Sequence, residues 1–269
     1  MLSQVNHEPA EPAYRALAVG AHAALSLVTR RDWRHQERVP QAGGVLFVAN
    51  HISNFDPLVL GEYLIYSGRW PRYLGKEELW HEPVVGWLAA HCGQIPIRRA
   101  AGESGAGLAA AEEALRRGKA VTVYPEGTIT GDPDGWPMVA RSGAARVALA
   151  ARCPVIPLGQ TGADLVIPGK QMHIPRLVPP KPITIACGEP VVLDDLYDAF
   201  HPEGDRGEDV DPAVVRRSHE AIVEAGARMM DAITALVEEV RGRRAPADRY
   251  DLRLGRRVPR PTPPDWATR

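Results

Sequence analysis

A histidine and an aspartate stand five positions apart in the stretch Ala49-Asn50-His51-Ile52-Ser53-Asn54-Phe55-Asp56-Pro57. A carboxylate that holds an imidazole makes it a general base, because it orients the ring and stabilises the protonated form. In a continuous helix, residues five apart point about 140° away from each other, so a working pair needs a turn between its members. Ser53 and Asn54 form turns, and Asp56-Pro57 is typical of a helix N-cap followed by the first helical residue. The stretch therefore predicts a His51–Asp56 pair at the start of a helix.

The same spacing can also arise without catalysis. Nine His and fifteen Asp give about 0.5 such matches by chance, and a buried structural histidine beside an N-cap aspartate would look the same. A metal site is disfavoured, since His81, His91 and Cys92 show no ligand pattern on one face. The three cysteines are scattered, which indicates reduced structural thiols.

The elements that position the pair alternate between strands and helices. Strands are expected at 44–48, 71–75, 93–97, 120–124, 155–160 and 183–186, and helices at 56–66, 83–92, 108–117, 141–150, 194–200 and 211–240. This order predicts an α/β fold, with a central, mostly parallel mixed sheet flanked by helices. The carboxyl ends of parallel strands share one edge, so the loops after them can converge on one cleft.

Two of these loops carry groups that could bind an anion. Arg98 and Arg99 follow a short apolar strand, where they are either surface arginines or a phosphate clamp. Glu126-Gly127-Thr128 follows another strand, where it is either a plain turn or a phosphate-binding loop. No Ser or Cys in the loops has the setting of a nucleophile, so a His/Asp pair suits activation of a hydroxyl on the substrate. Together these groups indicate a phosphorylated alcohol as substrate.

Charge and composition limit the partners. The formal net charge is −1, but residues 241–269 hold nine Arg against three acids, which gives +6 there and −7 elsewhere. This balance is not that of a nucleic-acid binder with a basic folded face. The start of the chain does not resemble a signal peptide, and no apolar run is long enough to span a bilayer.

Three parts of the chain are expected. Residues 1–40 form a segment whose amphipathic helix, 13–29, either packs on the core or lies at a membrane interface. Residues 41–240 form the α/β domain, which ends in a long helix; the Pro-rich stretch 166–180 within it is a candidate lid. Residues 241–269 form an Arg- and Pro-rich tail that is disordered, extended over the surface or in contact with anionic lipid.

Four stretches resemble the motifs of the glycerolipid acyltransferases, the 1-acyl-sn-glycerol-3-phosphate acyltransferase group. They are the His51–Asp56 motif, Gly93-Gln94-Ile95-Pro96-Ile97-Arg98, Tyr124-Pro125-Glu126-Gly127-Thr128 and Val155-Ile156-Pro157-Leu158. Their order and spacing agree with the family over about residues 44–190. The resemblance implies a glycerol-phosphate acyltransferase-like fold.

The resemblance also implies a reaction and its residues. An acyl group would pass from acyl-CoA or acyl carrier protein, as co-substrate, to the sn-2 hydroxyl of lysophosphatidic acid, with no cofactor and no metal. His51 would be the general base and Asp56 its partner. The groups expected to bind the glycerol phosphate are Arg98, Glu126, Gly127 and Thr128, with Lys76 matching a recurrent family lysine. The implied location is peripheral, at the cytoplasmic face of the cell membrane.

One departure from the family pattern concerns the acceptor. The third motif often continues with Arg, but Ile129 stands here. Arg99 or Arg141 could supply the missing contact. Alternative activities are acylation of another lysophospholipid or of a glycosylated phosphoinositide, and a further alternative is a non-catalytic lipid-binding protein.

Overall fold

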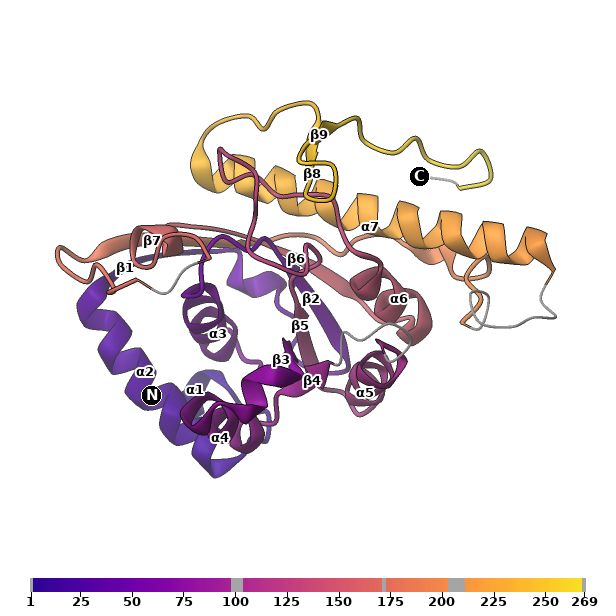
Figure 1. Cartoon of the computed structure of the whole chain (residues 1–269). Helices are drawn as coiled ribbons and strands as arrows, with labels where there is room; N and C mark the ends of the chain where they lie inside the picture. The colour runs from indigo at the N-terminus through magenta and orange to yellow at the C-terminus, as the bar shows by residue number, and fades with distance from the viewer. Residues whose placement is uncertain (1, 98–103, 171–172, 203–210, 268–269) are drawn as a thin grey trace.

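A seven-stranded sheet forms the centre of the molecule (Figure 1). The structure is a computed structural model that describes residues 2–97, 104–170, 173–202 and 211–267. The order across the sheet is β1-β7-β6-β2-β5-β3-β4. The strand bounds are β1 Thr29–Arg34, β2 Val45–Ala49, β3 Pro71–Lys76, β4 Ile95–Ile97, β5 Ala120–Val123, β6 Val155–Thr161 and β7 Lys181–Cys187.

Five neighbouring strands, from β6 to β4, run parallel, whereas β7 is antiparallel to β6 and pairs in parallel with β1. This confirms the predicted mostly parallel mixed sheet. The ends of β2, β5, β3 and β4 therefore lie at one edge, and the loops that carry the motifs start there.

Helices cover both faces of the sheet. On one face lie α1 Leu2–Val5, α2 Pro12–Val28, α3 Asp56–Tyr66 and α4 Pro83–His91; on the other lie α5 Ser104–Arg116, α6 Ser142–Ala151 and α7 Pro212–Arg241. Short 3₁₀ turns occur at η1 Gln36–Arg38, η2 Glu77–His81, η3 Ala163–Leu165 and η4 Asp194–Leu196. Each face has its own apolar core, which is why these helices show the predicted periodicity.

The long helix α7 packs directly on the sheet. Asp211 caps its start by accepting a hydrogen bond from the Ala213 amide at 2.8 Å, as its sequence predicts. At Gly159 in β6, an added Cβ would lie 2.5 Å from the Cβ of Leu236. Only glycine allows the helix to come this close to the strand.

The two end segments are both tied to the α/β domain. In the N-terminal segment, α2 packs through Tyr14, Ala18 and Leu25, and residues 29–34 add strand β1 to the sheet. In the C-terminal segment, the hairpin of β8 Arg249–Asp251 and β9 Arg256–Val258 lies beside α7 (Figure 1). The division at residues 40 and 240 remains a prediction, but both segments contact the domain.

Among the described residues, no helix combines the length and apolar character needed to cross a membrane.

Candidate active site

The predicted His51–Asp56 pair is formed. Nδ1 of His51 lies 2.7 Å from Oδ2 of Asp56. Because a carboxylate only accepts, Nδ1 carries the proton and Nε2 keeps its lone pair. Within the described part of the chain, Nε2 has no hydrogen-bond partner, and the His51 side chain is 16% exposed. The imidazole therefore presents a basic nitrogen to an accessible space.

Asp56 binds the loop that precedes it. Its Oδ2 also accepts hydrogen bonds from the amides of Ile52, at 2.6 Å, and Ser53, at 2.9 Å. Phe55 is the N-cap and Asp56 is the first helical residue, so the predicted N-cap at Asp56 is wrong by one position. The carboxylate turns backward to close the five-residue loop instead of capping α3. Burial raises the pKa of Asp56, and its N–H donors oppose that shift.

Glu126 fixes the backbone of His51 from the neighbouring loop. One carboxylate oxygen accepts from the His51 amide at 2.9 Å, and the other accepts from the Met138 amide at 3.0 Å. The side chain is 1% exposed, and burial raises the pKa of Glu126 to about 8. The Thr130 amide donates to the carbonyl of His51 at 2.7 Å. The two motif loops are thus joined through both backbone groups of the proposed base.

Two contacts, one of His51 and one of the neighbouring Asn50, were not predicted. The ring of Tyr124 stacks on the imidazole, with centroids 4.1 Å apart and planes inclined by 13°. Asn50 forms three hydrogen bonds of 2.9–3.0 Å with Gln160, through side-chain and backbone groups of both residues. The Asn50–Gln160 pair ties the end of β2 to β6. Asn50 belongs to the first motif and Gln160 follows the fourth, but their pairing depends on strand order, which no local signal gives.

Three of the other predicted binding residues, Gly127, Thr128 and Lys76, lie at the same edge of the sheet. Gly127 has φ +69°, and an added Cβ there would lie 2.7 Å from Cδ of Arg141, so this turn requires glycine. Thr128 is half-buried in the same loop. Lys76 is the last residue of β3 and pairs in register with Ile97, the last residue of β4. Arg98 and Arg99 lie outside the described residues.

The sequence over this region matches a known family. A family model described as Acyltransferase matches residues 30–161, which contain β1 to β6 and both motif loops. Residues 30–161 are therefore similar in sequence to the acyltransferase family.

Two curated proteins with acyltransferase names are also similar to parts of this chain. A lyso-ornithine lipid O-acyltransferase of Pseudomonas aeruginosa is 37% identical over 86 residues, which is 32% of this chain and 31% of that protein. The 1-acyl-sn-glycerol-3-phosphate acyltransferase BAT2, chloroplastic, of Brassica napus is 27% identical over 124 residues, which is 46% of this chain and 34% of that protein. The chain thus spans about a third of the length of these curated relatives.

A solved structure shows the same fold. The 1-acyl-sn-glycerophosphate (LPA) acyltransferase PlsC from Thermotoga maritima superimposes with a TM-score of 0.56 and 22% identity. The similarity covers 87% of this chain and 81% of that one. At this level of identity the likeness concerns the fold alone.

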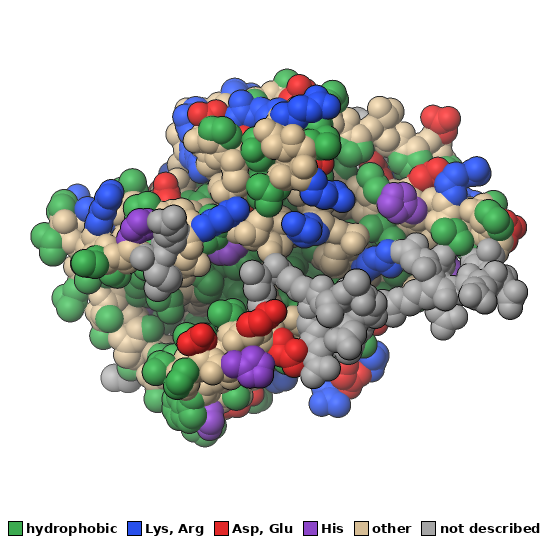
Figure 2. Space-filling model, in the orientation of Figure 1, with side chains coloured by type: hydrophobic (Ala, Val, Ile, Leu, Met, Phe, Trp, Pro, Cys, Tyr) green, Lys and Arg blue, Asp and Glu red, His purple; other side chains and the backbone are tan. Residues whose placement is uncertain are grey.

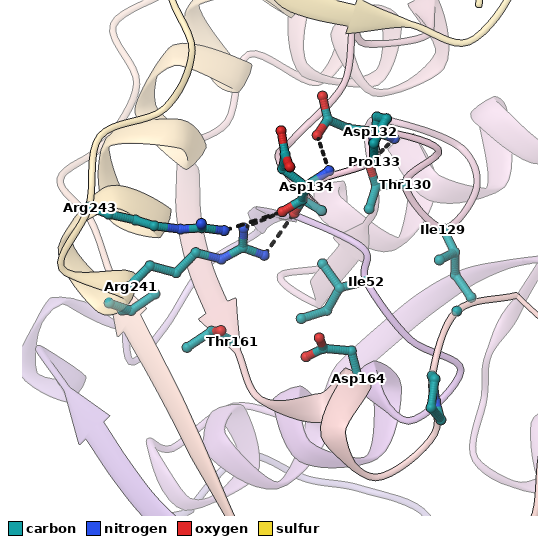
Figure 3. Close-up of a pocket in the computed structure, with 14 residues that line it drawn as sticks. Ile52, Ile129, Thr130, Asp132, Pro133, Asp134, Thr161, Asp164, Arg241 and Arg243 are labelled. Carbon is teal, nitrogen blue, oxygen red and sulfur yellow. Dashed lines mark hydrogen bonds between the residues drawn. The ribbon is translucent and has the colours of Figure 1, made fainter.

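A cavity of about 650 Å³ lies next to the loops that follow β2 and β5 (Figure 3). Ile52 and Ile129 line it from those loops, and Arg241 and Arg243 reach it from the end of α7. His51 is not among its described lining residues. Arg241 donates to the carbonyls of Asp134 and Gly135, at 3.2 and 2.7 Å, and so ties the end of α7 to the loop that follows β5.

Ile129 lines this cavity, and most of its surface is buried in the protein interior. Its side chain is 5% exposed, so the position after Gly127-Thr128 supplies packing where family motifs often carry arginine. The side chain of Arg141 lies against Gly127, which places a cation beside the motif turn. No group of three His, Cys, Asp or Glu side chains suited to a metal occurs among the described residues.

Proposed function

We propose that the protein acylates the sn-2 hydroxyl of lysophosphatidic acid, taking the acyl group from acyl-CoA or acyl carrier protein and giving phosphatidic acid. The observation that carries the proposal is the His51–Asp56 pair, in which Nε2 of His51 has no partner among the described residues. The pair lies within residues 30–161, which match the acyltransferase family model.

The geometry supports a direct transfer. His51 Nε2 takes the proton of the acceptor hydroxyl as its oxygen attacks the thioester carbonyl. The new C–O bond forms, the C–S bond breaks, and the imidazolium returns its proton to the departing thiolate. Asp56 keeps the ring oriented and stabilises its positive charge in the intermediate. No acyl-enzyme is required, because the substrate supplies the nucleophile.

The acceptor phosphate would be bound at the shared strand edge. Gly127 and Thr128 offer the turn, and Lys76 and Arg98 remain the predicted cations for this phosphate. Both oxygens of Glu126 already accept backbone hydrogen bonds, so its part in binding is to hold the His51 loop in place. In this proposal the enzyme works as a peripheral protein at the cytoplasmic face of the cell membrane, in contact with anionic lipid.

A second acceptor class follows from Ile129. Its buried apolar side chain removes one expected phosphate contact, and a relative of 37% identity is named for lyso-ornithine lipid. An acceptor whose headgroup carries a carboxylate and an amine, in place of a phosphate, is therefore the competing substrate.

An acceptor panel tests the proposal. Purified protein is mixed with acyl-CoA and either lysophosphatidic acid or lyso-ornithine lipid, and release of free CoA thiol is followed. We expect faster release with lysophosphatidic acid. Faster release with lyso-ornithine lipid would show that this lipid, and not lysophosphatidic acid, is the preferred acceptor. No release with any lysolipid would contradict an acyltransferase that uses acyl-CoA.

The proposed base is tested by His51→Ala. Loss of the general base should lower kcat by about 10²–10⁴-fold without changing the cooperative unfolding transition. His219→Ala, on the exposed face of α7, is the matched control and should keep full turnover. Full turnover in His51→Ala would show that another group accepts the proton.

A further inference from the structure

The segment 173–179 exposes apolar side chains to an unusual degree. All seven of its residues are exposed, with Ile174 at 91%, Val178 at 87% and Leu177 at 40%. Its two prolines restrict the backbone, so these side chains lose little further freedom when they are buried against another surface. Large apolar groups gathered in this way mark an interaction site more often than a solvent-facing loop.

The charged residues just before and after this segment in the sequence are all basic. From 165 to 188 the chain contains no Asp or Glu, and its ionisable groups are Lys170, His173, Arg176 and Lys181, apart from Cys187. Cations beside exposed apolar side chains suit the boundary of a bilayer that carries negative headgroups.

The end of α2 extends the same surface. Thr29 pairs in register with Lys181, so the chain leaving α2 and the chain leaving segment 173–179 enter the sheet side by side. Leu27, two residues before Thr29, is 76% exposed, and Arg30 follows it on the surface. Figure 1 shows β1 and β7 at this end of the molecule, and Figure 2, in the same orientation, shows hydrophobic and basic side chains there. The nearby Asp32 pairs with Arg34 at 2.7 Å.

This surface is attached to the catalytic loop. Ser53 Oγ donates to the carbonyl of Ile167 at 2.6 Å, and Asn54 donates to the carbonyl of Lys170 at 3.1 Å. Ser53 also forms an isolated bridge with Gly169. Ser53 and Asn54 lie within the loop that Asp56 closes, so whatever holds the 165–181 region also positions the loop of His51.

A second exposed apolar surface, on α4, has the opposite charge. Val84 and Trp87 of α4 are 70% and 55% exposed, but Glu77, Glu78 and Glu82 lie beside them in η2 and at the start of α4. In Figure 2 acidic side chains gather over this part of the face. Negative lipid headgroups would repel it, so it does not compete for the same partner.

We propose that segment 173–179, together with Leu27, inserts into the headgroup layer of an anionic bilayer and holds the His51 loop at the lipid surface. The purpose of this contact rests on the proposed function, because a lysolipid acceptor resides in such a layer. The contact itself can be measured without turnover.

Vesicle binding tests the proposal. The full chain is incubated with vesicles of phosphatidylglycerol and phosphatidylcholine, or of phosphatidylcholine alone, and the bound fraction is measured by flotation. The double variant Ile174→Ser/Val178→Ser should bind the anionic vesicles about tenfold or more weakly, since two apolar anchors are lost. Val192→Ser removes a valine of 61% exposure from the segment between β7 and η4 and should bind as the wild type does.

Turnover separates this proposal from the proposed function. The double variant should lose turnover of acceptor presented in vesicles while it keeps turnover of a short-chain acceptor dispersed in water. If no acceptor is used at all, the acyltransferase proposal fails, and flotation still decides the membrane contact. Unchanged binding of the double variant to anionic vesicles, or equally tight wild-type binding to neutral vesicles, would overturn the inference.

Discussion

At the scale of single residues, Asp56 contacts both the imidazole of His51 and the loop before α3, and it does so through one oxygen. Its Oδ2 accepts from His51 and from the amides of Ile52 and Ser53, so it orients the ring and closes the loop. Its Oδ1 has no hydrogen-bond partner among the described residues. Within the described residues, the polar contacts of this carboxylate are therefore all made through Oδ2.

The variant Asp56→Asn separates orientation from charge. An asparagine carbonyl can accept the same three N–H bonds, so the loop should keep its shape while the imidazolium loses its counter-charge. We expect kcat to fall by about 10²–10⁴-fold, with a smaller loss of unfolding free energy than in Asp56→Ala. Steady-state kinetics and denaturant unfolding measure the two quantities.

Asp56→Ala is the comparison for this prediction. Removing the acceptor leaves buried amides unpaired, at about 1–3 kcal/mol each, so this variant should also lose stability. Wild-type kcat in Asp56→Asn would contradict a role for the carboxylate charge in turnover.

At the scale of elements, Glu126 couples the loop after β5 to the loop after β2. The carboxylate holds backbone amides of His51 and Met138, so its loss leaves two buried donors without acceptors. Glu126→Ala should therefore lower the unfolding free energy by about 2–6 kcal/mol and displace the His51 loop, which reduces kcat. Glu112→Ala is a matched control from α5, where the glutamate is half-buried, and should change stability much less.

The raised pKa of Glu126 predicts a pH dependence. The folded value of about 8 exceeds the ordinary value of about 4.3, so between these pH values the folded state binds more protons than the unfolded state. The contribution of Glu126 to stability is complete below pH about 4.3 and declines as pH rises toward 8. Unfolding free energies at pH 5 and pH 8 should differ less in Glu126→Gln than in the wild type. An identical difference in both proteins would contradict a buried, titrating Glu126.

At the scale of the whole molecule, the C-terminal hairpin fastens the segment that follows the third motif. Arg257 in β9 contacts both oxygens of Asp132, at 2.9 and 3.0 Å, and the Asp132 side chain is 1% exposed. The Val139 amide donates to the carbonyl of Tyr250 in β8 at 2.9 Å. The tail therefore supports residues 130–139, whose ends bind His51 and Glu126.

Arg257→Ala tests this support. It leaves a buried carboxylate without its counter-ion, which should lower the unfolding free energy by about 3–5 kcal/mol. Arg253→Ala is the matched control, because Arg253 is 75% exposed and lies 3.9 Å from its acidic partner. The control should change stability by less than about 0.5 kcal/mol. Equal effects of the two substitutions would show that the hairpin does not support the loop.

Prediction from sequence succeeded where the signals are local. The apolar run before His51, the turn residues after it and the Asp211-Pro212 start of α7 all depend on neighbouring residues, and the structure agrees at each. The element of most consequence that was not predicted is β1. Residues 29–34 hold four charged side chains, so they do not resemble a strand, yet pairing with β7 satisfies their backbone. Helix α5 begins at Ser104, four residues before the predicted start.

The sequence by itself determined the alternation of strands and helices, the His51–Asp56 pair and the glycine turn at 127, because periodicity and turn chemistry act over a few residues. Only the tertiary structure decided what surrounds the pair. Strand order brings Gln160 to Asn50 and stacks Tyr124 on His51. Packing places Ile129 in the interior and Glu126 between two backbones. These contacts join residues far apart in the chain, and they form because buried polar groups must find partners wherever the fold brings them.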